Sequence, residues 1–97
     1  MTTQDNNTGA APTLEPPKPQ ALKQWKVIVH NDDVNTYEHV IKSFMQIVNL
    51  DLETAYQKTV EVDKQGLSIV AITHKEKAEL LQEQLQSQSL TVTIEPD

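Results

Sequence analysis

One feature constrains the possible folds of this chain most. It is a run of apolar and β-branched residues that stops abruptly at three polar residues. Residues 25–30 read Trp-Lys-Val-Ile-Val-His, which is typical of a β-strand, and Asn31-Asp32-Asp33 follow directly. Asn and Asp favour turns because their side chains bond the nearby backbone. We therefore predict a strand over residues 25–30 that ends in a turn carrying one amide and two carboxylates.

Three helices are predicted after this turn. Apolar side chains recur at helical spacing, and a residue able to cap a helix precedes each run. The predicted helices span about 36–48 after Asn35, 52–64 after Asp51, and 74–86 after Thr73. Gly66 is expected to end the second helix, because glycine readily adopts the left-handed conformation found there.

Two further strands complete the predicted fold. They are the aliphatic segment 67–72 and the alternating segment 90–94. The order β-α-α-β-α-β fits an α+β two-layer sandwich, in which a three-stranded antiparallel sheet carries all three helices on one face.

The folded domain is predicted to begin at residue 25. Residues 1–24 hold four of the five prolines among mostly polar residues, so we expect a flexible N-terminal extension. Its ionised side chains cancel, and the net charge of −6 therefore falls on residues 25–97.

Composition narrows the function classes. The acidic balance and the lack of a basic stripe argue against nucleic acid, and no apolar run is long enough for a membrane span or secretion signal. The absence of cysteine excludes thiolate metal sites and disulfides and fits a reducing compartment. We expect a cytoplasmic monomer without a cofactor.

The turn Asn31-Asp32-Asp33 admits three interpretations. It could be only a turn, or its oxygens could accept hydrogen bonds from an ammonium group. A metal or acid-base site is the third, with Asp63 as a further acid. Metals such as Ca²⁺ need six or more oxygens, and no nucleophile elbow, phosphate loop or zinc helix accompanies the acids. An enzyme is therefore not expected.

A longer motif includes this turn. The segment Val-Ile-Val-His-Asn-Asp-Asp-Val-Asn-Thr-Tyr-Glu-His-Val-Ile over residues 27–41 resembles the opening of the ClpS adaptor family. The resemblance continues through 62–66, 75–79 and 90–94. It implies an adaptor that binds N-degron substrates by a bulky hydrophobic first residue. It also implies delivery to the N-terminal domain of a Clp/Hsp100 unfoldase, of ClpA or ClpC type, that works with the ClpP peptidase.

The resemblance also implies roles for residues. Asn31 and Asp33 would be the main residues that bind the substrate α-amino group. Asp63 and Asp32 would be further members of the same site. The side-chain pocket would be lined by Val29, Tyr37, Val40, Thr59, Val62 and Leu90. Glu76 and Glu79 would lie on the unfoldase docking face.

Three positions depart from the family pattern. Asp63 stands where a histidine is usual, and Tyr37 and Thr59 stand where methionines are usual. These departures leave open a ClpS-like modulator of the unfoldase whose N-degron specificity is altered or lost.

Overall fold

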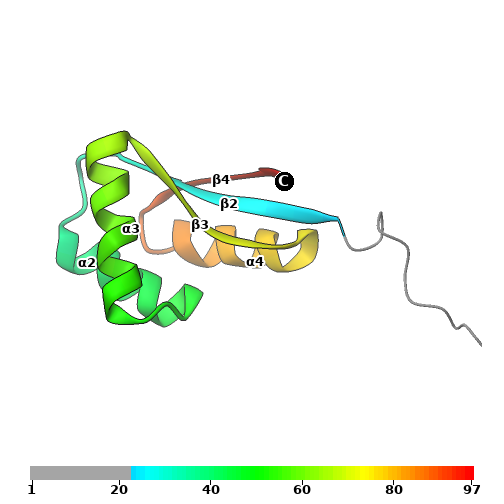
Figure 1. The fold of residues 1–97 in the computed structure, drawn as a ribbon, viewed down its shortest axis with the longest axis horizontal. Coiled ribbons are helices and arrows are strands. Elements are labelled where there is room, and N and C mark those ends of the chain that lie inside the picture. The colour runs from blue at the N-terminus through cyan, green and yellow to red at the C-terminus, as the bar shows by residue number, and fades with distance from the viewer. Residues whose placement is uncertain (1–22) are drawn as a thin grey trace, which may run out of the picture.

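The computed structural model describes residues 23–97, which form three strands and three helical segments (Figure 1). Of the extension predicted for residues 1–24, residues 1–22 lie outside the described range. The elements are β2 (Gln24–His30), α2 (Tyr37–Ser43) with its π-helical continuation η2 (Phe44–Val48), α3 (Leu52–Gln65), β3 (Leu67–His74), α4 (Lys75–Gln86) and β4 (Thr91–Pro96). The predicted order is confirmed.

The sheet is antiparallel throughout and has the strand order β3-β2-β4. Val29 pairs with Ser68 on one side and with Val92 on the other. The register against β3 shifts between Val27 and Ile28, which leaves Val70 as the extra residue of a β-bulge. The two-layer α+β prediction is therefore correct in strand direction as well as in element order.

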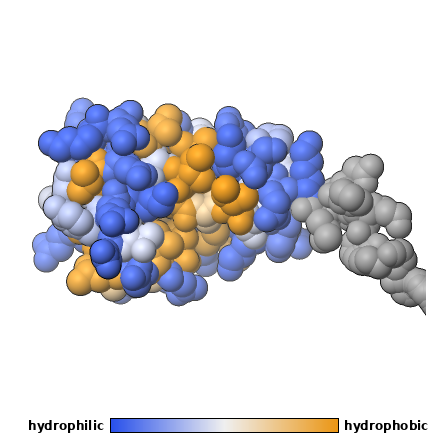
Figure 2. Space-filling view, in the orientation of Figure 1, coloured by the Kyte–Doolittle hydropathy of each residue, from blue (hydrophilic) through white to orange (hydrophobic). Residues whose placement is uncertain are grey.

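The core lies between this sheet and the helices. Its most enclosed large side chains are Phe44, Leu85, Val27 and Val29. Ile28 is buried too, but it alternates with Val27 and Val29 and is absent from their cluster, so it belongs to the opposite face of the sheet. Figure 2 shows exposed apolar side chains gathered along β3 between more hydrophilic ends. Leu67 and Ile72 of that strand are about half exposed.

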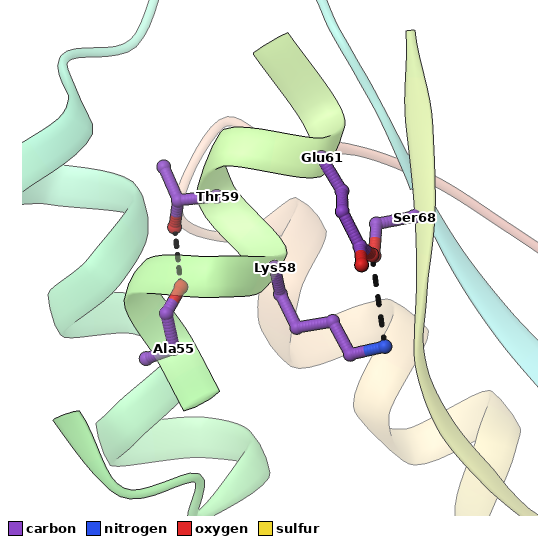
Figure 3. Close-up of polar contacts among 5 residues, drawn as sticks. All are labelled: Ala55, Lys58, Thr59, Glu61 and Ser68. Atoms are coloured by element: carbon purple, nitrogen blue, oxygen red, sulfur yellow. Dashed lines mark hydrogen bonds and ion pairs between the residues drawn. The ribbon is translucent and has the colours of Figure 1, made fainter. Parts of the chain in front are cut away.

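A polar contact ties α3 to β3. The Ser68 hydroxyl donates to Glu61 Oε1 at 2.6 Å, and Lys58 Nζ lies 3.7 Å from the same oxygen (Figure 3). Ser68 is buried, and its hydroxyl needs this partner. The contact fixes α3 against the strand that follows it.

Two of the three predicted caps are wrong by one residue. Thr36, not Asn35, caps α2, because its Oγ1 accepts from the His39 N–H while the Asn35 amide bonds elsewhere. His74, not Thr73, caps α4, because its Nδ1 accepts from the Lys77 N–H. Asp51 caps α3 as predicted, and Gly66 ends it with φ 92°.

The first predicted helix changes character near its end. Residues 44–48 are wound as a π-helix, and Asn49 stops it in the left-handed conformation with φ 67°. Among residues 23–97, no helix is long and apolar enough to cross a membrane.

Candidate functional site

All ten residues predicted for the α-amino cradle and the side-chain pocket line one cavity of about 230 Å³. The cavity opens between the end of β2, the start of α2 and the second half of α3. The full lining is Val29, His30, Asn31, Asp32, Asp33, Asn35, Tyr37, Val40, Thr59, Val62, Asp63 and Leu90. The structure thus brings together residues separated by up to 61 positions in the chain.

The floor of the cavity consists of its buried lining residues. These are Val29, Val40, Thr59, Val62 and Leu90, each no more than 8% exposed. The Thr59 hydroxyl donates to the Ala55 carbonyl within α3 at 2.8 Å, so it leaves no unsatisfied donor in the floor (Figure 3). The floor can therefore receive an apolar side chain without leaving the Thr59 hydroxyl unsatisfied.

The turn after β2 is shaped by its own side chains. The Asn31 amide oxygen accepts from the Asp33 N–H at 3.2 Å, and Asp33 takes the left-handed conformation with φ 60°. The Asn31 N–H donates to the Gly66 carbonyl at 2.9 Å, which joins the turn to the end of α3. These bonds hold Asn31 and Asp33 beside the helix that carries Asp63.

Asp32 is engaged inside the protein. Its carboxylate accepts from the Val34 N–H, from the Asn35 amide and from the Thr91 hydroxyl at 3.1–3.3 Å. The Asn35 amide also donates to the Ser89 carbonyl at 3.0 Å. Asp32 therefore braces the turn against the loop before β4, whereas no side-chain bond of this kind holds Asp33 within residues 23–97.

Tyr37 and Asp63 form the tightest polar contact at the cavity mouth. The Tyr37 hydroxyl donates to Asp63 Oδ2 at 2.6 Å. This hydrogen bond raises the pKa of Tyr37 above its usual value, because it stabilises the protonated phenol beside a carboxylate. The Tyr37 ring also meets Tyr56 edge-on, with centroids 6.4 Å apart.

The charge at the mouth is negative. Asp32, Asp33 and Asp63 all line the cavity, and no ion pair within residues 23–97 involves any of them. In that part of the chain no three His, Asp or Glu side chains are grouped to hold a metal ion. The mouth therefore offers hydrogen-bond acceptors and negative charge to a cationic group.

The predicted docking residues lie apart from the cavity. Glu76 and Glu79 are exposed on α4, on whose opposite side Ala78, Leu81 and Leu85 are buried. Sequence reasoning missed two lining residues, His30 and Asn35. Their position directly beside Asn31-Asp32-Asp33 is the signal that could have included them.

Comparison with known proteins defines the class of this one. Residues 20–93 match the family model described as ATP-dependent Clp protease adaptor protein ClpS. The ClpS adapter of Thermosynechococcus vestitus is 40% identical over 75 residues, which cover 75% of this chain and 80% of that protein. The adapter of a Synechococcus species is 32% identical over 99 residues, which cover 98% and 95%.

A solved structure gives the same fold. The structure of Agrobacterium tumefaciens ClpS2 bound to L-phenylalaninamide aligns with a TM-score of 0.72 at 22% identity, covering 77% of this chain and 98% of that one. The chain belongs to the ClpS family of Clp protease adaptors. This is an adaptor family and not a catalytic one.

Proposed function

We propose that this protein is an N-degron adaptor that holds the free N-terminus of a substrate in the cavity described above. The observation that carries the proposal is the layered cavity, with a buried floor beneath the exposed acceptors Asn31, Asp33 and Asp63. A substrate N-terminus has the matching chemistry, since an ammonium group and a side chain leave the same carbon atom.

The chemistry of the two layers supports this assignment. An ammonium group has three donors and needs nearby acceptors once it is desolvated. One hydrogen bond to a charged group and one buried Leu-sized side chain each contribute about 1.5–3 kcal/mol. After the cost of association, several such terms correspond to a dissociation constant of about micromolar.

The structural relative supports the ligand class. L-phenylalaninamide, which is bound to Agrobacterium ClpS2, carries a free α-amino group and an apolar side chain. The cavity of this chain offers acceptors and an apolar floor for the same two groups. We therefore assign bulky hydrophobic first residues as its substrate class.

Delivery is the second part of the proposal. Glu76 and Glu79 are exposed on α4 and lie outside the cavity, so one surface can bind an unfoldase while the other holds a substrate. We assign this face to the N-terminal domain of a Clp/Hsp100 unfoldase of ClpA or ClpC type. Residues 1–24 would serve as an extension to the adaptor domain 25–97, and the complex would act in the cytoplasm.

A peptide titration tests the recognition step. Labelled peptides beginning with Leu, Phe, Trp or Ala are each prepared with a free or an acetylated N-terminus. We expect about micromolar binding of the free bulky peptides, and at least about tenfold weaker binding of the Ala and acetylated peptides. Equal affinity for free and acetylated peptides would refute the ammonium cradle.

A charge-matched pair tests the docking face. Glu79→Gln is compared with Glu53→Gln, which removes the same charge from an exposed position at the start of α3. Binding to the isolated N-terminal domain of a ClpA-type or ClpC-type unfoldase should weaken for the first variant only. Equal binding by both variants would remove Glu79 from the docking face.

A second candidate rests on the Tyr37–Asp63 hydrogen bond. Because this bond already occupies one Asp63 oxygen, the cavity could have lost N-degron binding while α4 still engages the unfoldase. The protein would then be a ClpS-like modulator. No binding of any free peptide, together with retained unfoldase binding, is the result that favours it.

A further inference from the structure

The Tyr37–Asp63 hydrogen bond spans the mouth of the cavity. Tyr37 is the first residue of α2, and Asp63 lies in the last turn of α3. Both residues line the cavity, and their 2.6 Å contact joins the two helices across it. Since both side chains are exposed, the core has no need of this bond.

The tyrosine ring has a second fixed contact. The Tyr56 ring meets it at an interplanar angle of 64°, an edge-to-face arrangement that aromatic rings favour. Tyr56 lies two helical turns before Asp63 on α3. The Tyr37 ring and its hydroxyl therefore both contact α3, and these two contacts restrict the rotation of the phenol.

Asp63 keeps accepting capacity after this bond forms. A carboxylate has two oxygens and about four lone-pair sites, and the Tyr37 hydroxyl takes one site on Oδ2. Within residues 23–97, no cation pairs with Asp63 and no other side-chain hydrogen bond reaches it. An incoming ammonium group can thus bond Oδ1 without displacing the phenol.

We propose that Tyr37 is a positioning residue that fixes the Asp63 carboxylate so that its second oxygen completes the α-amino cradle with Asn31 and Asp33. This inference rests on the proposed N-degron function and assigns a task to two positions that depart from the family pattern. A carboxylate on a helix end rotates freely unless something holds it. The phenol limits that rotation before the substrate arrives, which lowers the entropic cost of binding.

A double-mutant cycle tests the coupling. Tyr37→Phe removes the hydroxyl and keeps the ring, Asp63→Ala removes the carboxylate, and a third variant combines both. For a Leu-initiated peptide with a free N-terminus, we expect each single change to weaken binding by about tenfold. The combined variant should bind no more weakly than Asp63→Ala, because the hydroxyl acts only through the carboxylate.

The second measurement separates positioning from a structural role. The ratio of the affinity for the free peptide to that for its acetylated form should fall in Tyr37→Phe, whereas a general loosening of the cavity leaves this ratio unchanged. Ser87→Ala is the matched control, because it removes an exposed hydroxyl that donates at 2.6 Å to Gln84 outside the cavity. It should leave the ratio at the wild-type value.

Each remaining outcome has a distinct meaning. Unchanged binding by Tyr37→Phe, or additive losses in the cycle, would overturn the positioning role alone. Tighter binding by Tyr37→Phe would show that the phenol competes with the ammonium group, which also overturns it. If the wild-type protein itself fails to distinguish free from acetylated peptides, the proposed function fails with it.

Discussion

The floor and the rim of the cavity differ in how deeply their residues are buried. The floor residues, such as Val29 and Leu90, belong to the core cluster of the domain and are almost fully buried. The exposed residues at the mouth of the cavity form its rim; they are Asn31, Asp33, Tyr37 and Asp63. Under the proposed function, recognition of a substrate side chain would be tied to folding, whereas recognition of its amino group would depend on exposed residues outside the core.

This difference bears on the three positions where the ClpS resemblance leads us to expect other residues, namely Tyr37, Thr59 and Asp63. Asp63 and Tyr37 are exposed, and their hydrogen bond lies outside the core cluster. Thr59 lies in the floor, and its hydroxyl is satisfied within its own helix. A polar residue is tolerated in the floor only with such a partner.

The largest expected effect is on the floor. Leu90→Ala removes a side chain that is 6% exposed and should lower the free energy of unfolding by about 2–4 kcal/mol. Leu80→Ala is the control, because Leu80 is 44% exposed and should cost no more than about 0.5 kcal/mol. Urea denaturation measures both. Equal losses would contradict the separation of floor from exposed surface.

The adjacent acids Asp32 and Asp33 should respond in opposite ways. Asp33→Asn keeps the preference for a left-handed backbone but removes the charge, so peptide affinity should fall by about tenfold with stability unchanged. Asp32→Asn places an amide where three donors converge, so the free energy of unfolding should fall by about 1 kcal/mol. Calorimetric titration and denaturation distinguish them, and the reverse pattern would exchange their assigned roles.

The pKa of the Tyr37 phenol can be measured directly and reports on its contact with Asp63. Tyr56→Phe leaves Tyr37 as the only tyrosine, so its ionisation can be followed by ultraviolet absorbance. We expect a pKa above the usual value of about 10, because the phenol proton bonds Asp63. Since the folded value is the higher one, the bond stabilises the fold below the unfolded pKa, and this contribution is lost as pH rises through the folded value. Adding Asp63→Asn should lower the Tyr37 pKa, and no change would contradict the contact.

The smallest effect is expected outside the cavity, at the start of α3. The Asp51 side chain caps this helix, and hydrogen bonds from Thr54 lower the pKa of its carboxyl group. Because the folded value lies below the unfolded one, the charge on Asp51 stabilises the protein above the unfolded pKa. This contribution is lost as pH falls through the folded value. The stability difference between wild type and Asp51→Ala should therefore shrink in acid, and a constant difference would argue against this cap.

Sequence patterns predicted the fold well where local chemistry decides it. Strands such as 25–30 and helices such as 52–64 lie where the residue patterns predict them. Their order predicted the two-layer arrangement of sheet and helices. The π-helical turn at 44–48 and the two displaced caps were not predictable in this way. The displaced cap of α2 depends on where the Asn35 amide finds partners in the folded structure.

The cavity could be predicted only in part. The resemblance to the ClpS family predicted that Asn31, Asp33 and Asp63 lie close together. In the structure they line one cavity. It could not predict the Tyr37–Asp63 bond, because two side chains on different helices have to be placed in space before their contact appears. Nor could local sequence show that Asp32 is engaged by Thr91, since these residues are 59 positions apart.

The central claim is that one cavity binds a substrate through its α-amino group. Amide chemical shifts recorded while a Leu-initiated peptide is added test it most directly. We predict that the largest changes occur at Asn31, Asp33 and Asp63, that Glu76 and Glu79 stay unchanged, and that the acetylated peptide produces none of these changes. Shifts concentrated on α4, or the same shifts with the acetylated peptide, would contradict the account.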